Sequence, residues 1–482
     1  MSPSNKSNFS YYFVQNVFIG IVPLVSLAIF TRVFSPEEYG LYALVLIFGN
    51  FFSSIITFGL NFSYEKLFFE LDDNKKTILL HSIILFCFCL FILFSPPIYF
   101  FGNKIIDYFE IYGVNNKLLY SSYIASSLIS FSNFFLLKYR NEKKAKNYSY
   151  LSLTIIIGQL LGSIFFIIYF GYRIEGFFYS SILVNFLVIL FFTKDISLKS
   201  ILVQLNNLKK AISIAFPLFP KILIGFLNSS YDKILLGFLK DQGSLGLYDI
   251  SYKISNQCYN FCTVLNNTFL PDFYLKINNW NKHSKKEIPN FLLKYFMIYI
   301  LFCSCVSYFS FELISLILAK EFHFAINIIS ILCVFFSFYF FQTVPILVHL
   351  GKSLTISKLT AIFFVISILI VFPGTYYFGI YGLAIGLSIS NFVFSIIHMY
   401  TCQKNLKLDW NFKIITKIYL YFILTTFLII ILREIELSYI IRLIIKLVLL
   451  SLFLYYVNYN KILDLKFYYN LGIKKILKLK AK

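Results

Sequence analysis

The sequence contains few charged residues. Asp, Glu, Lys and Arg make up 13% of its 482 residues, whereas soluble domains carry about 25%. Apolar runs of about 20 residues, the length that crosses a hydrocarbon core as a helix, recur from end to end, for example at residues 11–30 and 78–100. This pattern excludes a soluble globular protein. It predicts an all-α integral membrane protein, because lipid offers the backbone no hydrogen-bond partners outside its own segment.

Motifs for cofactors and metals are also missing. The sequence has no Gly-rich loop ending in Lys of the kind that cradles nucleotide phosphates, so it indicates no direct use of ATP. His81, His349 and His398 are far apart along the chain, and the eight cysteines lie within apolar runs or at their ends. Cysteines two residues apart on a helix point in different directions, unlike zinc ligands. We therefore expect no cofactor and no metal.

The apolar runs predict about fourteen transmembrane helices. They lie near residues 10–30, 41–62, 78–101, 118–137, 149–170, 174–192, 211–231, 246–270, 290–318, 324–348, 354–374, 380–402, 413–432 and 438–457. The two termini and the loops after even-numbered helices hold 30 of the 43 Lys and Arg residues, whereas the other loops hold seven. Because basic short loops favour the cytoplasmic side, we expect both termini in the cytoplasm. The net charge of +21 then reflects loops that face anionic lipid, and it indicates no nucleic-acid partner.

Short matches between the two halves indicate an internal duplication. The matching letters are 206 or 208 positions apart, at Gly40-Leu41-Tyr42 and Gly246-Leu247-Tyr248, at Tyr169-Phe170-Gly171 and Tyr377-Phe378-Gly379, and at Gly176 and Gly382. Each pair falls at the same point of a six-helix block. Because six is an even number, the two blocks share one orientation, and their pseudo-two-fold axis runs along the membrane normal, as in transporters built from parallel repeats.

The predicted organisation therefore has four parts. Residues 1–194 and 211–402 form two six-helix bundles, joined by residues 195–210 and followed by residues 403–482. The joining segment has apolar residues at mostly helical spacing and is predicted to be a cytoplasmic surface helix. The last part contains helices 13 and 14 and a basic cytoplasmic tail, residues 461–482, which we expect to lie on the membrane surface.

Several motifs resemble the Wzx-type flippases that export O-antigen and capsule repeat units. These flippases belong to a superfamily that also contains drug/cation antiporters and the lipid II flippase. The resemblance covers about the first 400 residues and is carried, in order, by residues 31–44 (TRVFSPEEYGLYAL), 57–60, 216–217, 232–237, 246–248, 252–254 and 379–384. The sequence departs from the family at Lys66 and Lys233, where the family commonly has Arg.

This resemblance implies a flippase of the bacterial inner membrane. Its substrate would be a polyprenyl-pyrophosphate-linked oligosaccharide repeat unit, moved from the cytoplasmic to the outer leaflet by alternating access for O-antigen or other surface polysaccharide synthesis. The implied partners are this substrate and membrane lipids, with a polysaccharide polymerase and a chain-length regulator as candidate protein partners.

Two alternatives stay open. One is a drug/cation antiporter of the same superfamily, and the other is a membrane-embedded polysaccharide polymerase or glycosyltransferase. Enzymes of the second kind generally need a sizeable loop or domain to build a catalytic pocket. The longest predicted outer loop, near residues 102–117, has about 16 residues, which argues against an enzyme.

Charged residues inside predicted helices are the candidate site residues, because such charges are costly in lipid and are functional by default. Lys221 lies ten residues into a predicted helix, about 15 Å deep. Pro217 and Pro220 precede it and can open the helix locally. We expect Lys221 to bind the pyrophosphate, with a snorkelling or structurally paired lysine as the alternative.

Four further candidates for substrate binding lie near the predicted outer end of helices 7 and 8. Asp249 and Lys253 are four residues apart, and therefore share one face of their helix. They either contact the substrate or neutralise each other. Asp232 and Lys233 fall at the end of the preceding helix, where they either contact the substrate or form an interfacial charge pair.

Three more charged residues complete the set. Arg32 and Lys66 flank helix ends in the matched motifs and are candidate anchors for lipid phosphate. Glu312 is the deepest acid outside helices 7 and 8, and it either couples transport to an ion or serves as a partnered structural acid. The Pro36-Glu37-Glu38 segment predicts the start of a helix, with Pro and two acids at its positive end.

Overall fold

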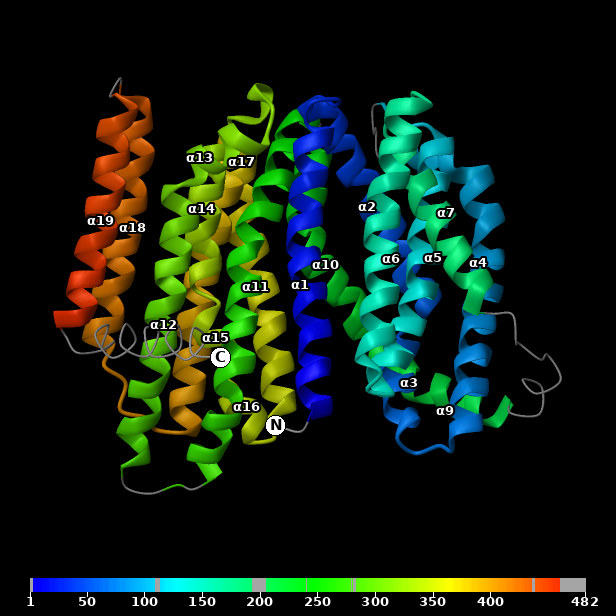
Figure 1. Ribbon diagram of the computed structural model, residues 1–482, viewed down its shortest axis with the longest axis horizontal. Coiled ribbons are helices and arrows are strands. Elements are labelled where there is room, and N and C mark those ends of the chain that lie inside the picture. The colour runs from blue at the N-terminus through cyan, green and yellow to red at the C-terminus, as the bar shows by residue number, and fades with distance from the viewer. Residues whose placement is uncertain are drawn as a thin grey trace. The chain divides into compact units, whose positions relative to one another are not determined.

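The chain is helical in the computed structural model, and it contains no β-strand within the residues that the structure describes (Figure 1). These are residues 3–108, 113–192, 205–239, 241–278, 280, 283–435 and 438–459. By the density of contacts the chain divides into two units. The first comprises Met1–Asp249 and Ile317–Phe322, and the second comprises Ile250–Leu316 and His323–Lys482.

The first unit begins with α1 and ends within α11. Its helices are α1 (Pro3–Phe30), α2 (Pro36–Thr57), α3 (Leu60–Phe68), α4 (Asp73–Tyr108), α5 (Asn116–Asn141), α6 (Ala145–Ile164, continued by a π-helical turn to Tyr169), α7 (Glu175–Phe192), α9 (Leu205–Ala215), α10 (Phe219–Phe238) and the start of α11 (Gln242–Asn278). The second unit takes the rest of α11 and all that follows it. Its helices are α12 (Ser284–Tyr308), α13 (Ser310–Ile317), α14 (Ala325–Ser337), α15 (Phe340–Thr343), α16 (Ile346–His349), α17 (Ser353–Asn405), α18 (Phe412–Glu434) and α19 (Tyr439–Tyr459).

The protein is a multi-pass membrane protein, and the prediction of about fourteen transmembrane helices is confirmed. Ten described segments are long and apolar enough to cross a membrane, and a shorter apolar helix covers Val17–Phe30. One of the ten, Leu354–Asn405, has 52 residues and contains a non-helical residue, Gly379, so it makes two crossings. α5 and α11, with 26 and 37 residues, supply the remaining two crossings.

The start of α2 forms as its sequence predicts. The Ser35 hydroxyl accepts a hydrogen bond from the Glu38 backbone N–H at 3.4 Å, and the Glu38 carboxylate accepts one from the Ser35 N–H at 3.1 Å. Pro36 occupies the first turn, where no helical partner for an N–H is needed. This capping box fixes where the chain enters α2.

Several predicted helices are broken in the structure. α2 ends at Thr57 because Phe58 and Gly59 both adopt left-handed backbone angles, and α3 then begins. The predicted helix at 324–348 divides into α14, α15 and α16, with a break before Pro345. Both breaks interrupt continuous apolar sequence, so the run of apolar letters alone does not reveal them.

α9 and α10 are separated by a 3-10 turn at Phe216–Leu218. Pro217 lies in this turn and Pro220 opens the first turn of α10, so the predicted local opening before Lys221 is present. The Ala211 and Ala215 side chains of α9 are part of the apolar core of the first unit. Lys210 of α9 also pairs with Glu70 at 2.8 Å, and this hydrogen bond lowers the pKa of the Glu70 carboxyl.

The two halves use the same kind of helical hairpin. In the first unit α6 and α7 are joined by a turn with Gly171 at φ 70°, and Ser180 donates a hydrogen bond to the Gln159 carbonyl oxygen. In the second unit α17 reverses at Gly379, with φ 55°, and Ser367 meets Ser390 at 3.2 Å across its two arms. These two turns contain the repeated Tyr-Phe-Gly letters, which supports the predicted duplication.

The predicted domain boundaries stay a prediction. The sequence places a boundary at residues 195–210, whereas the contacts group α9, α10 and the start of α11 with the first unit. Contact density measures packing, and it does not test where a duplication occurred. Of the predicted joining helix, residues 193–204 lie outside the described residues and the remainder forms the first half of α9. The predicted surface tail, residues 461–482, also lies outside the described residues.

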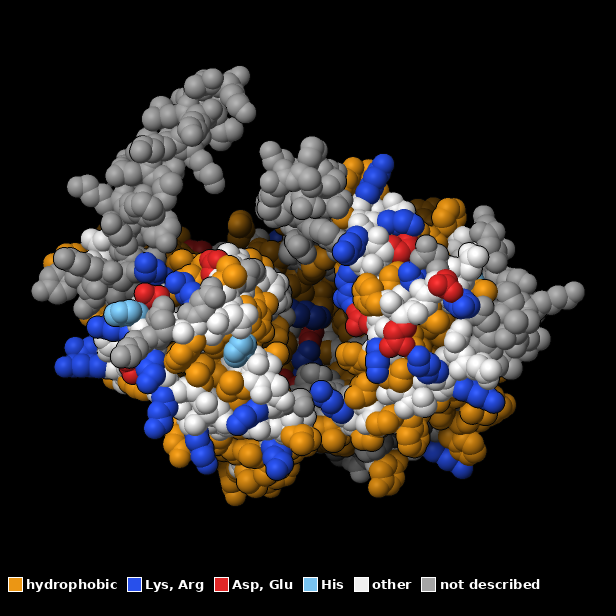
Figure 2. All heavy atoms as spheres, turned by 90° about the horizontal axis from the view of Figure 1, so that it is seen from below, with side chains coloured by type: hydrophobic (Ala, Val, Ile, Leu, Met, Phe, Trp, Pro, Cys, Tyr) orange, Lys and Arg blue, Asp and Glu red, His pale blue; other side chains and the backbone are white. Residues whose placement is uncertain are grey.

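Basic side chains are spread over one face of the molecule. Figure 2 shows Lys and Arg side chains on this face, with fewer Asp and Glu side chains among them. A face rich in Lys and Arg suits contact with the anionic cytoplasmic leaflet. The placement of both termini in the cytoplasm stays a prediction.

Candidate functional site

A group of polar side chains is buried where α10 and α11 meet. We call Asp232, Lys233, Tyr248 and Asp249 the α10–α11 cluster. Lys233 Nζ lies 2.7 Å from Asp249 Oδ1, and the Tyr248 hydroxyl donates a hydrogen bond to Asp232 Oδ2. Asp232 and Asp249 are only 3% and 2% exposed. The cluster therefore joins the two helices through two side-chain bonds that are largely shielded from solvent.

The start of α2 packs against the start of α11 beside this cluster. Gly40 and Gly246, the matching glycines of the repeated Gly-Leu-Tyr letters, lie against each other. A Cβ on Gly40 would lie 1.9 Å from the Gln242 carbonyl oxygen, and a Cβ on Gly246 would lie 1.9 Å from the Pro36 carbonyl oxygen. Only glycine at both positions allows the two backbones to approach this closely. From α2, Tyr42 interacts electrostatically with Asp249 and Lys233.

The structure assigns Asp249 a partner that sequence spacing did not indicate. The i,i+4 rule suggests Lys253, whereas the printed ion pair joins Asp249 to Lys233 of the neighbouring helix. Lys253 is half-buried on α11 and has interactions of its own. Asp232 and Lys233 are more deeply buried than an interfacial charge pair at a helix end would be.

Lys221 lies apart from the cluster. It is an exposed residue in the first turn of α10, directly after Pro220. Within the described parts of the chain, no Asp or Glu oxygen lies within 4 Å of its ammonium group, because it takes part in none of the ion pairs there. The structure therefore offers no support for Lys221 as a paired structural lysine.

Arg32 and Lys66 occupy different surroundings. The Arg32 guanidinium donates hydrogen bonds to the carbonyl oxygens of Ala28 and Ile317, the latter at 3.3 Å. It thereby fastens the end of α1 to the 317–322 segment, which belongs to the same unit. Lys66 is exposed in the last turn of α3. Anchoring of lipid phosphate by either residue stays a prediction.

Glu312 is a partnered acid. Its two carboxylate oxygens accept hydrogen bonds from Lys446 Nζ of α19, at 2.6 and 2.8 Å. The Lys446 side chain is 5% exposed and the Glu312 side chain 22%. A one-to-one pair of this kind supports the structural alternative named for Glu312, in which it holds α19 to α13.

Removing one member of this pair should destabilise the protein. We expect Glu312→Gln to lower the free energy of unfolding by about 3–5 kcal/mol, because it leaves the Lys446 charge buried without its partner. The double variant Glu312→Gln with Lys446→Met should recover most of this loss. The midpoint of thermal unfolding of the purified protein measures both effects.

Glu287→Gln is the matched control, since Glu287 forms a pair with Lys276 at 3.9 Å whose acid is 57% exposed. Exposed pairs contribute about 0–1 kcal/mol. Equal shifts in the unfolding midpoint for Glu312→Gln and Glu287→Gln would contradict a structural role for the buried pair.

An arginine network next to this pair was not predicted. Arg433, at the end of α18, donates hydrogen bonds to the Ser307 carbonyl oxygen at 3.0 Å and to the Ser310 hydroxyl at 2.7 Å. It also reaches Asn327 at 2.9 Å and Ser330 at 3.0 Å. One signal in the sequence was available, because Ser307, Ser310 and Ser330 interrupt otherwise apolar helices. The network holds α18 to α12, α13 and α14.

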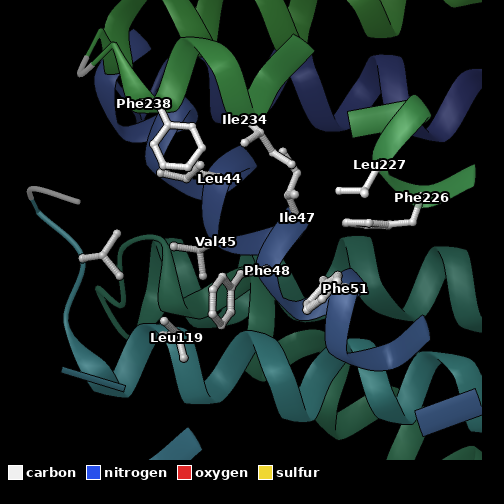
Figure 3. Close-up of a pocket in the computed structure, with 12 residues that line it drawn as sticks. Leu44, Val45, Ile47, Phe48, Phe51, Leu119, Phe226, Leu227, Ile234 and Phe238 are labelled. Carbon is white, nitrogen blue, oxygen red and sulfur yellow. The ribbon is translucent and has the colours of Figure 1, made fainter. Parts of the chain in front are cut away.

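An apolar cavity of about 210 Å³ lies within the first unit. Figure 3 shows the side chains that line it, which come from α2, α5 and α10 and include Leu44, Phe48, Phe51, Leu119, Phe226 and Ile234. Its side chains offer no charge and no hydrogen-bonding group, so this cavity suits an apolar chain and would not hold a sugar or a pyrophosphate. No group of three or more metal-ligating side chains occurs among the described residues.

Comparison with known proteins places the fold and the family. The chain is similar to a solved structure of the lipid II flippase MurJ in an inward closed conformation, with a TM-score of 0.69, 17% identity, and 94% of this chain and 99% of that chain covered. It is also similar to an inward-facing multidrug resistance MATE family transporter of the MOP superfamily, with a TM-score of 0.53, 13% identity, and 80% and 93% of the two chains covered. No curated protein matches the sequence. Residues 6–273, more than half of the chain, match the family model described as polysaccharide biosynthesis protein. The chain therefore belongs to the polysaccharide biosynthesis protein family.

Proposed function

We propose that the protein is a flippase for a polyprenyl-pyrophosphate-linked oligosaccharide. It moves the repeat unit from the cytoplasmic to the outer leaflet of the bacterial inner membrane by alternating access, for O-antigen or other surface polysaccharide synthesis. The observation that carries this proposal is the family match over residues 6–273, taken together with a fold shared along 94% of the chain with a lipid II flippase.

The charges of the chain fit such a substrate. A pyrophosphate needs cations that are not already neutralised, and Lys221 is exposed and takes part in no ion pair of the described residues. Lys233 is bonded to Asp249, so it contributes less free charge. We therefore assign the first contact with the pyrophosphate to Lys221, with Lys253 as a second candidate cation and Arg32 and Lys66 as candidate anchors near helix ends.

A flippase accounts for the chain better than the two alternatives. A polymerase or glycosyltransferase needs a catalytic pocket built from a sizeable loop or domain. The described outer turns are short, as at residues 31–35 between α1 and α2. A drug/cation antiporter shares the superfamily fold, but the family match is to polysaccharide biosynthesis. A polysaccharide polymerase and a chain-length regulator would then be the next proteins to act on the translocated unit.

Deleting the gene tests the proposal. We expect surface polysaccharide to disappear and the lipid-linked repeat unit to accumulate on the cytoplasmic leaflet. The side on which it accumulates is measured by treating inverted and right-side-out membrane vesicles with a glycan-modifying reagent that does not cross the membrane. The unit should be accessible only in inverted vesicles, and expression of the intact gene should restore both phenotypes.

Each alternative predicts a different result. Accumulation of unpolymerised units on the outer leaflet would identify a polymerase, and failure to form the unit would identify a glycosyltransferase. Normal surface polysaccharide together with increased sensitivity to cationic drugs would identify an antiporter. Any of these three results contradicts the flippase proposal.

A further inference from the structure

Asp232 is a buried carboxyl group without a cation beside it. It lies on α10 and is 3% exposed. Its Oδ2 accepts a hydrogen bond from the Tyr248 hydroxyl, whereas its Oδ1 is buried and has no hydrogen-bond partner among the described residues. No ion pair of the described residues includes Asp232. Its surroundings therefore supply one neutral donor and no charged one.

The neighbouring groups do not change this balance. Lys233 follows Asp232 along α10, but its ammonium group is 2.7 Å from Asp249 Oδ1. From α2, Tyr39 and Tyr42 interact electrostatically with Asp249, and they carry hydroxyl groups rather than cations. The titratable groups that face Asp232 are thus one lysine that is bonded to another acid, one partnered aspartate and tyrosines.

Burying an ionised carboxylate without a cation is far more costly than burying a neutral acid. A protonated carboxyl group also gains an O–H donor. We propose that Asp232 carries a proton in the conformation that the structure shows, and that it is a proton-binding site of the first unit. A single oxygen is sufficient to hold a proton, whereas a metal cation needs several oxygen ligands at once.

The position of this site links the proton to movement of α10 and α11. The Asp232–Tyr248 and Lys233–Asp249 bonds both join α10 to α11, beside the contact between Gly40 and Gly246. If α10 and α11 separate, water reaches Asp232 and the ionised form is no longer penalised, so the proton leaves. A proton gradient would then favour one conformation over the other. This coupling role rests on the proposed function, whereas the protonation of Asp232 does not.

Infrared spectroscopy of the purified full-length protein in lipid tests the site directly. At neutral pH the wild type should show the C=O stretching band of a protonated carboxylic acid. Asp232→Asn should lose this band and keep its fold, because asparagine is a neutral mimic of the protonated acid and its carbonyl oxygen still accepts from Tyr248. Tyr248→Phe should keep the band and shift it to higher frequency, because the C=O group loses a hydrogen bond.

Asp72→Asn is the matched control, since Asp72 is exposed and paired with Lys75 at 2.9 Å. It should leave the band unchanged. Absence of the band in the wild type, or its persistence in Asp232→Asn, would overturn the proposal. Sodium-dependent thermal stabilisation at constant pH, seen in the wild type and lost in Asp232→Asn, would replace the proton by a metal cation and overturn it as well.

These measurements use no glycan substrate, so their outcome is independent of what the protein transports. The coupling role is tested separately, by flipping of a lipid-linked oligosaccharide in proteoliposomes with an imposed pH gradient. The wild type should respond to the gradient and Asp232→Asn should not. An equal response in both would leave flipping intact and remove Asp232 from coupling.

Discussion

Replacing Lys221 by alanine should reduce export of the lipid-linked oligosaccharide about 10- to 100-fold while the amount of protein in the membrane stays unchanged. Hydrogen bonds to charged groups contribute about 1.5–3 kcal/mol each, which corresponds to such a factor. Surface polysaccharide and membrane protein level, measured on the same cells, provide the two readouts.

The structure explains why activity and folding should separate at this position. Lys221 is exposed and forms no ion pair with any described residue, so its removal leaves no partner charge without compensation. It follows the 3-10 turn at Phe216–Leu218, in the first turn of α10, where an alanine is compatible with the helix. A lysine that maintained the fold would instead lose protein level and activity together.

Two further variants make the result specific. Lys221→Arg keeps the charge and should retain part of the activity. Lys209→Ala removes an exposed lysine from α9 and should export as the wild type does. Normal export by Lys221→Ala would remove this residue from the substrate site. A decrease of equal size in Lys209→Ala would show that export responds to overall charge.

Gly40→Ala should prevent accumulation of folded protein. The added Cβ would lie 1.9 Å from the Gln242 carbonyl oxygen, and the obstructing atoms on both sides belong to backbone within helices. Overpacking of a tight core costs about 1–3 kcal/mol and occasionally more, and backbone cannot rotate away as a side chain does. We expect a loss of about 3 kcal/mol or more, and the same for Gly246→Ala, whose Cβ would lie 1.9 Å from the Pro36 carbonyl oxygen.

Gly225→Ala is the matched control. Gly225 lies within α10, and no atom comes within 4 Å of the position that its Cβ would take. Alanine there should be neutral or stabilising by up to about 1 kcal/mol, because it favours the helix. Membrane protein level and the elution profile in detergent distinguish the variants. Wild-type amounts of folded Gly40→Ala protein would show that α2 and α11 do not depend on this contact.

Local features of the fold could be predicted because their causes are local. The Ser35–Glu38 capping box requires only residues that are close in sequence. The break at Pro217 follows from the chemistry of proline, and the reversal of α17 at Gly379 from the tolerance of glycine for positive φ. Hydrophobic length gave the number of crossings for the same reason. The turn at Phe58 and Gly59 was missed, because a left-handed Phe leaves no signal in an apolar run.

The polar contacts could be predicted less well because they join different helices. Spacing on one helix pairs Asp249 with Lys253, yet Lys233 reaches Asp249 from α10. The protons of Arg433 find five acceptors spread over Ser307 to Ser330, and no pattern within α18 indicates them. Sequence showed which charges lie inside the membrane, and packing between helices determines which of them meet.

The contact between Gly40 and Gly246 bears on the ancestry of the chain. If the two halves arose by duplication of a six-helix protein, the same Gly-Leu-Tyr segment met a second copy of itself, and the ancestor was a homodimer held by this surface. Any substitution at that glycine would have struck both sides at once. Fusion into one gene removed that constraint from the surrounding residues, so that Asp232, Lys233 and Asp249 could be placed in one half alone. The asymmetry of the charged cluster would then be younger than the surface beside which it lies.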